Sequence, residues 1–212
     1  MGIQKYKRVL VIGAHPDDIE CGCGGLITRC IEAGNDVYFC VMSKCDNQFG
    51  EYEKDRLIKE CANSTHILGV KTKIDIHNIP NMELPEHRKE IMKILEEKQK
   101  ETQPELVLIP FINDPHQDHE TVAKASVRTF RNNETILQYE ILRHGSHSFT
   151  PNLFVDITKH LDKKLDALDC YVSQTSKRAY FNRECFKGLA RTRGAQSGYD
   201  YAEGFLIYKM FW

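Results

Sequence analysis

Several features that would place this chain in a special class are absent from its sequence. No apolar stretch approaches the roughly 18 residues needed to span a bilayer, and the first six residues lack the apolar core of a signal peptide. Positive and negative charges nearly balance, with 29 Lys and Arg against 30 Asp and Glu. These absences exclude a transmembrane protein and argue against a nucleic-acid-binding protein. They also predict a chain with no membrane anchor.

Disulfide bonds are not expected either, although the chain has eight cysteines. No secretory signal accompanies them, and several lie within apolar segments, where Cys acts as a small buried side chain. Cys21 and Cys23 are separated by one residue, which directs their sulfur atoms to different faces of a helix and favours core packing over zinc binding. We therefore expect reduced thiols and a cytoplasmic protein.

The chain has the length and composition of one globular domain. Its 212 residues can bury a sizeable core, and 41% of them are hydrophobic, including nine Tyr and ten Phe. No linker, internal repeat or low-complexity tract interrupts it. We predict a single domain over residues 1–212. The sequence leaves a homo-oligomer open.

Strand-like and helix-like segments alternate through the first two thirds of the chain. Strands are predicted over Arg8–Gly13, Asp36–Met42, Lys73–His77 and Leu106–Pro110. Helices are predicted over Ile19–Ala33, Glu53–Leu68, Glu86–Glu101 and Glu120–Phe130. This order is typical of an α/β fold with a mostly parallel sheet and helices on both faces.

The regular alternation of strand-like and helix-like segments ends after Asn132. Further strands are predicted over Thr135–Leu142, Asn152–Asp156 and Phe205–Trp212, with helices over Ile157–Val172 and Asn182–Arg193. We expect these C-terminal strands and helices to pack on the same domain and to help wall its site. The loops Ser43–Tyr52 and Gly145–Asn152 are expected to form further pocket walls.

Two clusters of His and Asp follow two of the predicted strands. The first cluster contains His15, Asp17 and Asp18, and the second contains His116, Asp118 and His119. Ligands of open parallel sheets bind beyond the carboxyl ends of the strands. If the two strands are neighbours, all six side chains converge on one crevice.

Their chemistry matches a catalytic zinc site, which takes three protein ligands and leaves a position open. His15, Asp18 and His119 supply two imidazoles and one carboxylate. Asp17 then suits a general base, and His116 suits an acid or an oxyanion stabiliser. Asp118 is expected to orient one of the histidines. Another divalent metal is also compatible with these ligands.

Two other interpretations of these residues exist. The three aspartates of the clusters, Asp17, Asp18 and Asp118, could simply cap helices, although capping does not explain both clusters together. Gly22, Gly24 and Gly25 hint at a dinucleotide-binding loop, but Ile27 replaces its third glycine, so a nicotinamide enzyme is disfavoured. The glycines are better explained by close packing of the first helix on the sheet.

The motifs resemble those of the LmbE-like, or PIG-L, family of zinc-dependent N-deacetylases. The resemblance rests on Ala14-His15-Pro16-Asp17-Asp18, Gly22-Cys23-Gly24-Gly25, Pro115-His116-Gln117-Asp118-His119, Ser173-Gln174, and the segments 193–198 and 201–205. It implies a Rossmann-like sheet and a zinc ion held by His15, Asp18 and His119. It also implies Asp17 as general base and His116, supported by Asp118, as the electrophilic or acid group.

Family members remove the acetyl group from an N-acetylglucosamine-type amino sugar, so the expected partner is a small amino-sugar conjugate. Candidate substrate-binding residues are Arg56, Arg143, Gln174 and Arg193. Three alternatives stay open: an N-formyl sugar as substrate, a non-sugar amide as substrate, and a glycan-binding module with a relic site. Retention of all six clustered His and Asp residues disfavours the third.

Overall fold

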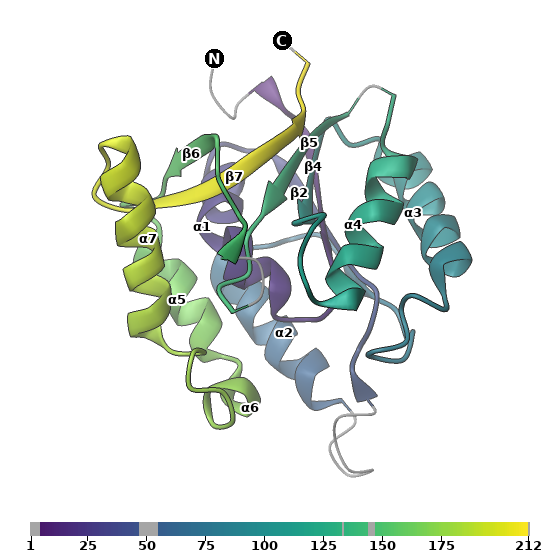
Figure 1. Ribbon diagram of the computed structural model, residues 1–212, viewed down its shortest axis with the longest axis horizontal. Helices are drawn as coiled ribbons and strands as arrows, with labels where there is room; N and C mark the ends of the chain where they lie inside the picture. Colours follow the sequence, from purple (N-terminus) through teal and green to yellow (C-terminus); the bar gives the residue numbers. More distant parts are fainter. Residues whose placement is uncertain (1–4, 47–54, 133, 144–146, 212) are drawn as a thin grey trace.

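One mixed β-sheet connects the two parts of the chain. The computed structural model describes residues 5–46, 55–132, 134–143 and 147–211, and in this part of the chain seven strands pair in the order β3-β2-β1-β4-β5-β7-β6 (Figure 1). The strands are β1 Arg8–Gly13, β2 Asp36–Val41, β3 Ile74–Ile76, β4 Leu106–Pro110, β5 Thr135–Tyr139, β6 Leu153–Asp156 and β7 Ala202–Lys209.

The sheet is parallel from β3 to β5, and β7 runs antiparallel to both β5 and β6. The mostly parallel α/β fold is thus confirmed. Strands β1 and β4 pair directly, with Val9 opposite Leu106 and Val11 opposite Leu108. The chain order reverses between these two strands, so the crevice at their carboxyl ends is the place where such sheets bind ligands.

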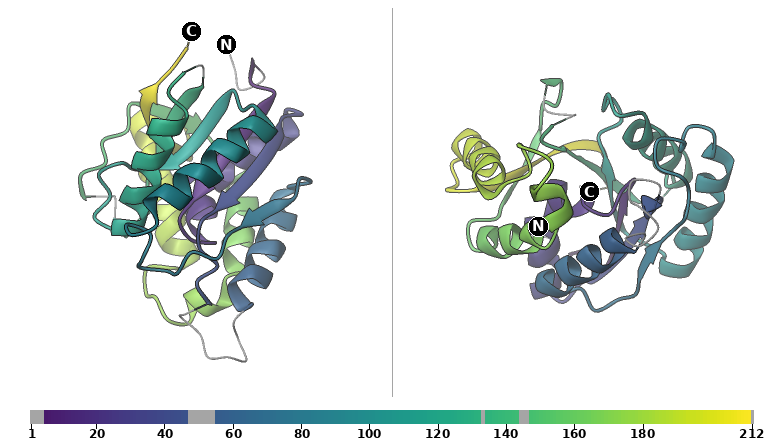
Figure 2. Two further views of the ribbon diagram at one scale, coloured as in Figure 1. Left: turned by 90° about the vertical axis from the view of Figure 1, so that its right-hand side faces the viewer. Right: turned by 90° about the horizontal axis from the view of Figure 1, so that it is seen from below.

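Helices cover both faces of the sheet. They are α1 Asp18–Glu32, α2 Arg56–Leu68, α3 Arg88–Thr102, α4 Gln117–Thr129, α5 Leu161–Asp169, α6 Val172–Thr175 and α7 Arg183–Ser197. Side chains alternate along β1: Leu10 and Ile12 pack in one core cluster with residues of α3 and α4, whereas Val9 and Val11 pack with α1. Figure 2 shows the two helix layers on opposite sides of the sheet.

Helix α1 packs tightly against neighbouring segments at its glycines. A Cβ atom at Gly22 would overlap the Tyr139 ring, and one at Gly25 would come within 2.6 Å of Ile157. The Tyr139 hydroxyl donates a hydrogen bond of 2.7 Å to the carbonyl oxygen of Ile12, at the end of β1. The expectation that the glycines permit close packing is confirmed.

The observed helix and strand boundaries differ most from the predicted ones in the C-terminal part of the chain. The long helix predicted over Ile157–Val172 is wrong: Ile157–His160 forms a turn, α5 ends at Asp169, and the short α6 follows. The break occurs at Tyr171, whose buried side chain is anchored to the loop after β1 and whose backbone leaves the helical conformation. The last strand begins earlier than predicted, at Ala202, and part of the predicted helix Glu53–Leu68 lies outside the described residues.

The described helices and the cysteines bear on the expected lack of membrane spans and of disulfide bonds. None of the described helices is long and apolar enough to cross a membrane. All eight cysteines of the chain lie in the described part and have free thiols.

Candidate metal centre and active site

The loop after β1 presents His15, Asp17 and Asp18, all of which are buried. Asp17 occupies the N-cap position of α1 but makes no side-chain capping hydrogen bond. The Asp18 carboxylate instead reaches backwards and accepts hydrogen bonds from the backbone N–H groups of Ala14 and His15, at 3.0 and 2.8 Å. Helix capping therefore does not explain either carboxylate.

The loop after β4 presents His116, Asp118 and His119 at the start of α4. His116 is the N-cap, and its Nδ1 accepts a hydrogen bond from the backbone N–H of Asp118 at 3.2 Å. The buried carboxylate of Asp118 is directed elsewhere, so it does not cap the helix in the manner considered from sequence. Because β1 and β4 are neighbours, the two loops meet, as predicted.

Three side chains of these loops, Asp18, His15 and His119, lie at the corners of a triangle that we call the ligand triangle, with each oxygen of the Asp18 carboxylate facing one imidazole. Asp18 Oδ1 lies 3.3 Å from His119 Nε2, Asp18 Oδ2 lies 3.4 Å from His15 Nδ1, and the two nitrogens are 3.3 Å apart. A tetrahedral zinc ion with ligands at roughly 2.0–2.1 Å holds them about 3.3–3.4 Å apart. The two imidazole nitrogens and the carboxylate between them therefore fit a divalent ion of this kind.

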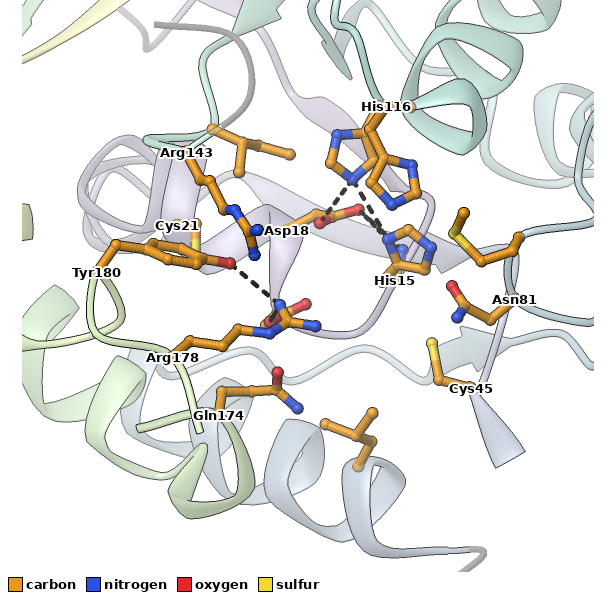
Figure 3. Close-up of a pocket in the computed structure, with 15 residues that line it drawn as sticks. His15, Asp18, Cys21, Cys45, Asn81, His116, Arg143, Gln174, Arg178 and Tyr180 are labelled. Atoms are coloured by element: carbon orange, nitrogen blue, oxygen red, sulfur yellow. Dashed lines mark hydrogen bonds and ion pairs between the residues drawn. The ribbon is translucent and has the colours of Figure 1, made fainter. Parts of the chain in front are cut away.

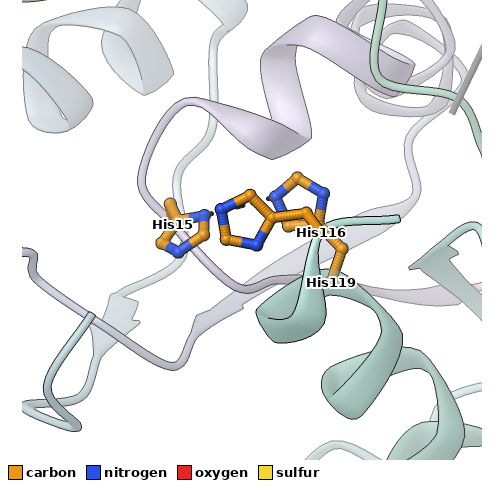
Figure 4. Close-up of side chains that lie close together, drawn as sticks. All are labelled: His15, His116 and His119. Atoms are coloured by element: carbon orange, nitrogen blue, oxygen red, sulfur yellow. Dashed lines mark hydrogen bonds between the residues drawn. The ribbon is translucent and has the colours of Figure 1, made fainter. Parts of the chain in front are cut away.

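A second, looser set consists of the three histidines, whose ligand atoms lie within 4.8 Å of one another (Figure 4). His116 stacks on His119, with ring centroids 4.3 Å apart. The Asp18 carboxylate lies within 3.4 Å of both His15 and His119, whereas Nδ1 of His116 already caps α4.

Carboxylates support both of the proposed ligand histidines from behind. Asp118 Oδ2 lies 3.0 Å from Nε2 of His15 and accepts a hydrogen bond from the backbone N–H of Met82. Asp114 Oδ2 lies 3.2 Å from Nδ1 of His119. Such partners fix the orientation of a metal-binding imidazole and increase its basicity. The resemblance assigned Asp118 to His116, but the structure directs its carboxylate to His15.

The electrostatics of the centre favour a cation. Burial alone would lower the pKa of His15, but Asp18 and Asp118 raise it to about 10. Burial likewise opposes the charge on His119, whereas Asp18 and Asp114 raise its pKa to about 9. The carboxylates thus draw protons onto the imidazoles, and they would stabilise a divalent ion that replaced those protons.

The two remaining groups of the centre differ from the proposed ligands. Burial and the adjacent Asp18 raise the pKa of Asp17, although Arg178 and His15 act in the opposite direction. Burial and the other two imidazoles lower the pKa of His116 to about 4. Neutral His116 accepts at Nδ1, so its proton is on Nε2, which leaves it a hydrogen-bond donor. We refer to His15, Asp17, Asp18, His116 and His119 as the histidine wall.

A pocket of about 180 Å³ opens beside this wall. Its opposite side is formed by residues from the C-terminal part of the chain (Figure 3), which we call the arginine wall: Arg143, Gln174, Arg178 and Tyr180. Ligand pockets for drug-sized molecules are typically about 300–1,000 Å³. This pocket is smaller than that range, so it encloses only part of a larger substrate.

The predicted substrate-binding residues divide into two pairs. Arg143 and Gln174 line the pocket. Arg56 and Arg193 are not among the lining residues: Arg56 pairs with Glu60 at 3.3 Å, and Arg193 makes two hydrogen bonds of 2.7 Å to buried Glu140. Both of these arginines are therefore engaged in ion pairs away from the pocket.

Several residues of the site were not found from the sequence. Asp114 lies directly before the recognised Pro115–His119 motif, so its acidic side chain next to that motif was an available signal. Asn81 and Met82 lie in a loop identified only by its prolines, and Arg178 and Tyr180 follow a helix too short to show a period. Two loops were expected to form pocket walls. In the first, Ser43–Tyr52, Cys45 lines the pocket and residues 47–52 fall outside the described residues. In the second, Gly145–Asn152, residues 145–146 fall outside the described residues and residues 147–152 do not line the pocket.

Comparisons with known proteins identify the family of the chain and several relatives. The pattern of the family "PIG-L: GlcNAc-PI de-N-acetylase" matches residues 10–130, a range that contains the whole histidine wall and ends before the arginine wall. Diacetylchitobiose deacetylase of Thermococcus kodakarensis is 32% identical over 93% of this chain and 82% of its own.

Solved structures are similar over nearly the whole chain. N,N'-diacetylchitobiose deacetylase of Pyrococcus horikoshii, complexed with an inhibitor, superposes with a TM-score of 0.78 and 28% identity, covering 97% of this chain and 85% of the other. The conserved protein TT1542 of Thermus thermophilus gives a TM-score of 0.79 and 25% identity over 96% of both chains.

Proposed function

The chain belongs to the PIG-L family of de-N-acetylases, as its motifs predicted, and from this membership and the site's geometry we propose that it hydrolyses the N-acetyl group of an N-acetylglucosamine-type amino sugar or sugar conjugate. One observation carries the proposal. Two loops, one after β1 and one after β4, bring the ligand triangle of Asp18, His15 and His119 together with a further carboxylate and an imidazole donor.

We assign the divalent ion to His15, Asp18 and His119, and we propose zinc as its identity. Two imidazoles with one carboxylate form a common zinc ligand set. When bound, such an ion polarises a carbonyl group and makes water more acidic. Asp118 and Asp114 keep the two imidazoles in the orientation and tautomer that binding requires.

Asp17 acts as the general base in this proposal. It is buried beside the ligand triangle, and its carboxylate lines the pocket without capping α1. It accepts a proton from the attacking water and holds it at the carboxylate. The proton then passes from this carboxyl group to the departing amine.

His116 stabilises the negative charge that develops on the carbonyl oxygen. Its Nδ1 accepts from the backbone N–H of Asp118, so Nε2–H is the group that donates to that oxygen. Its stacking on His119 holds the ring beside the ligand triangle. A neutral donor suits this task because its proton stays in place throughout the reaction.

A deacylation screen tests the proposal. Acetate and formate release are measured from methyl N-acetylglucosaminide, diacetylchitobiose, their N-formyl analogues and a simple aryl acetamide, each with and without a chelator. Chelator-sensitive acetate release from the sugars supports the proposal. Formate release alone, or cleavage of only the non-sugar amide, identifies one of the alternative substrates, and no release from any substrate contradicts hydrolytic function.

We place the reaction in the cytoplasm. Eight free thiols, six of them buried, support a reducing compartment. The proposed partner is a small amino-sugar conjugate, in keeping with the limited volume of the pocket.

A further inference from the structure

The arginine wall contains two guanidinium groups that line the same pocket. Arg143 follows β5, and Arg178 follows α6, yet both contact Tyr180. The Arg143 guanidinium carbon lies 5.5 Å from the Tyr180 ring centroid, and Arg178 Nη1 donates to the Tyr180 hydroxyl at 3.1 Å. Figure 3 shows the two arginines entering the pocket from the side opposite His15 and His116.

Most hydrogen-bond donors of these two arginines are unused within the described part of the chain. A guanidinium has five N–H donors. Arg178 uses only Nη1, which also lies 3.6 Å from Asp17 Oδ2, and its Nε and Nη2 have no partner among the described residues. Within the same residues, Arg143 has no hydrogen bond or ion pair, only its contact with the Tyr180 ring.

The other arginines proposed from the sequence behave differently. Arg193 is neutralised by Glu140 through two hydrogen bonds, and Arg56 is paired with Glu60. Of the two acidic lining residues among those described, Asp18 is held by His15 and His119, and Asp17 makes only one longer ion pair, at 3.6 Å to Nη1 of Arg178. A divalent ion at the proposed ligands would add to the positive charge.

From this arrangement we propose that the substrate carries an anionic group, a carboxylate or a phosphate, which binds between Arg143 and Arg178. The inference rests on the proposed function, because it places the acetamido group at the histidine wall and a substituent of the same sugar at the arginine wall. Planar guanidinium groups recognise both kinds of anion through paired N–H donors. The Tyr180 ring holds the two groups on one side of the pocket.

A different role for Arg178 is that it only adjusts Asp17, at 3.6 Å. The two roles predict different kinetics. Loss of an anion-binding residue lowers kcat/KM for anionic substrates more than for neutral ones. Loss of a residue that only adjusts the general base lowers kcat for both substrate types by the same factor, so that their ratio stays constant.

The experiment compares four substrates: N-acetylglucosamine 1-phosphate, the carboxymethyl glycoside of N-acetylglucosamine, the methyl glycoside and diacetylchitobiose. We expect the wild-type protein to favour at least one anionic substrate by about tenfold or more in kcat/KM. The phosphate and the carboxylate distinguish the two sources of the anion. High salt should reduce this preference, because the Arg143 side chain is exposed.

Two variants and a matched control follow. Arg143→Gln and Arg178→Gln should each reduce the anionic-to-neutral ratio of kcat/KM several-fold. Arg191→Gln is the control, since Arg191 also lies over a tyrosine ring, that of Tyr201 at 5.7 Å, but on the exposed side of α7 and away from the pocket. It should keep the wild-type ratio.

The possible results separate the two proposals. Equal kcat/KM for anionic and neutral substrates in the wild type overturns the anion site and leaves deacetylation intact. If no substrate releases acetate, the proposed function fails. The anion site is then tested independently by calorimetry of ligand binding. Glucosamine 1-phosphate or carboxymethyl glucosaminide should then bind more tightly than methyl glucosaminide, and loss of that difference in Arg178→Gln supports the site; equal binding of all three overturns it.

Discussion

The two walls of the pocket are built in different ways. The histidine wall comes from two short loops after adjacent parallel strands, and its residues hold one another through contacts of about 3 Å in a largely buried cluster. The arginine wall comes from the segment after β5, from α6 and from the segment after α6, and its arginines are partly or fully exposed. The side chains of the histidine wall are thus fixed in position by their neighbours, whereas the arginines of the other wall keep hydrogen-bond donors available for a ligand.

Removal of the metal should have the largest effect, because it should abolish the function of the histidine wall and leave ligand binding at the arginine wall intact. Dialysis against a chelator should abolish acetate release and lower the melting temperature, because Asp18 and two imidazoles lose the cation they enclose. Binding of an anionic amine product at the arginine wall should persist, as measured by calorimetry. Restoration of activity by added zinc is the control, and full activity in the metal-free protein would contradict the assignment of the ligands.

The general base provides the next largest effect. Asp17→Asn should reduce kcat by about 10²–10⁴-fold, since the amide cannot accept the proton of water. Metal content, measured by elemental analysis, should stay at the wild-type level because Asp17 is not one of the proposed ligands. Asp162→Asn, on the exposed side of α5, is the matched control. Near-normal turnover in Asp17→Asn would remove this residue from the mechanism.

Substitution of Asp114 tests whether the carboxylates behind the histidine wall contribute to metal affinity. Asp114→Asn should weaken metal affinity by about 10–100-fold, because His119 loses the carboxylate 3.2 Å from its Nδ1. Competition with a chromophoric chelator measures this affinity. The exposed Asp36→Asn serves as control. An unchanged affinity would show that Asp114 contributes only its hydrogen bond to the backbone N–H of His116.

The close approach of α1 to the sheet positions the first loop and can be tested by stability. Gly22→Ala places a Cβ atom against the Tyr139 ring and should lower the free energy of unfolding by about 1–3 kcal/mol. Gly188→Ala, in α7, meets no atom within 4 Å and should be neutral or slightly stabilising. Urea denaturation compares the two, and equal stabilities would argue against the tight packing.

The smallest expected effect concerns Glu20, which connects the two regions. The Tyr171 hydroxyl donates its one hydrogen to the carbonyl oxygen of Pro16 and lies 2.9 Å from Glu20 Oε1, and burial raises the pKa of Glu20 to about 8. The folded protein therefore keeps a proton that the unfolded chain releases above its ordinary pKa of 4.5. Stability should fall as pH rises from about 4.5 to about 8.

Glu20→Gln removes this titration. Its free energy of unfolding should decrease less than that of the wild type between about pH 6 and pH 8, by about 1 kcal/mol or more, in urea titrations at both values. Parallel pH profiles for the two proteins would show that Glu20 is ionised in the folded state.

The sequence allowed the histidine wall to be predicted because local rules determine it. An apolar run predicts a parallel strand, ligands gather at its carboxyl end, and the residue types of both clusters match a metal site. β1 and β4 were predicted with the boundaries the structure shows. The identity of the supporting carboxylates needed tertiary structure, because Asp118 turns to His15, 103 residues away in the chain.

The arginine wall could not be predicted in the same way. Whether an arginine lines a pocket or pairs with a carboxylate depends on contacts between distant segments, such as Arg193 with Glu140. The helix break at Tyr171 also arises from a distant contact, since its hydroxyl bonds the loop after β1. Periodicity within 157–172 indicates one continuous helix and contains no sign of that contact.

The order of the two walls along the chain has an evolutionary consequence. Every group assigned to bond cleavage precedes residue 130, and every group assigned to anion recognition follows it, while pairing of β4 with β5 joins the two stretches in one sheet. Mutations in the later stretch can therefore retarget the enzyme to a new sugar conjugate without rebuilding its hydrolytic apparatus. Exchanging residues 134–211 between homologues should transfer substrate preference as a module.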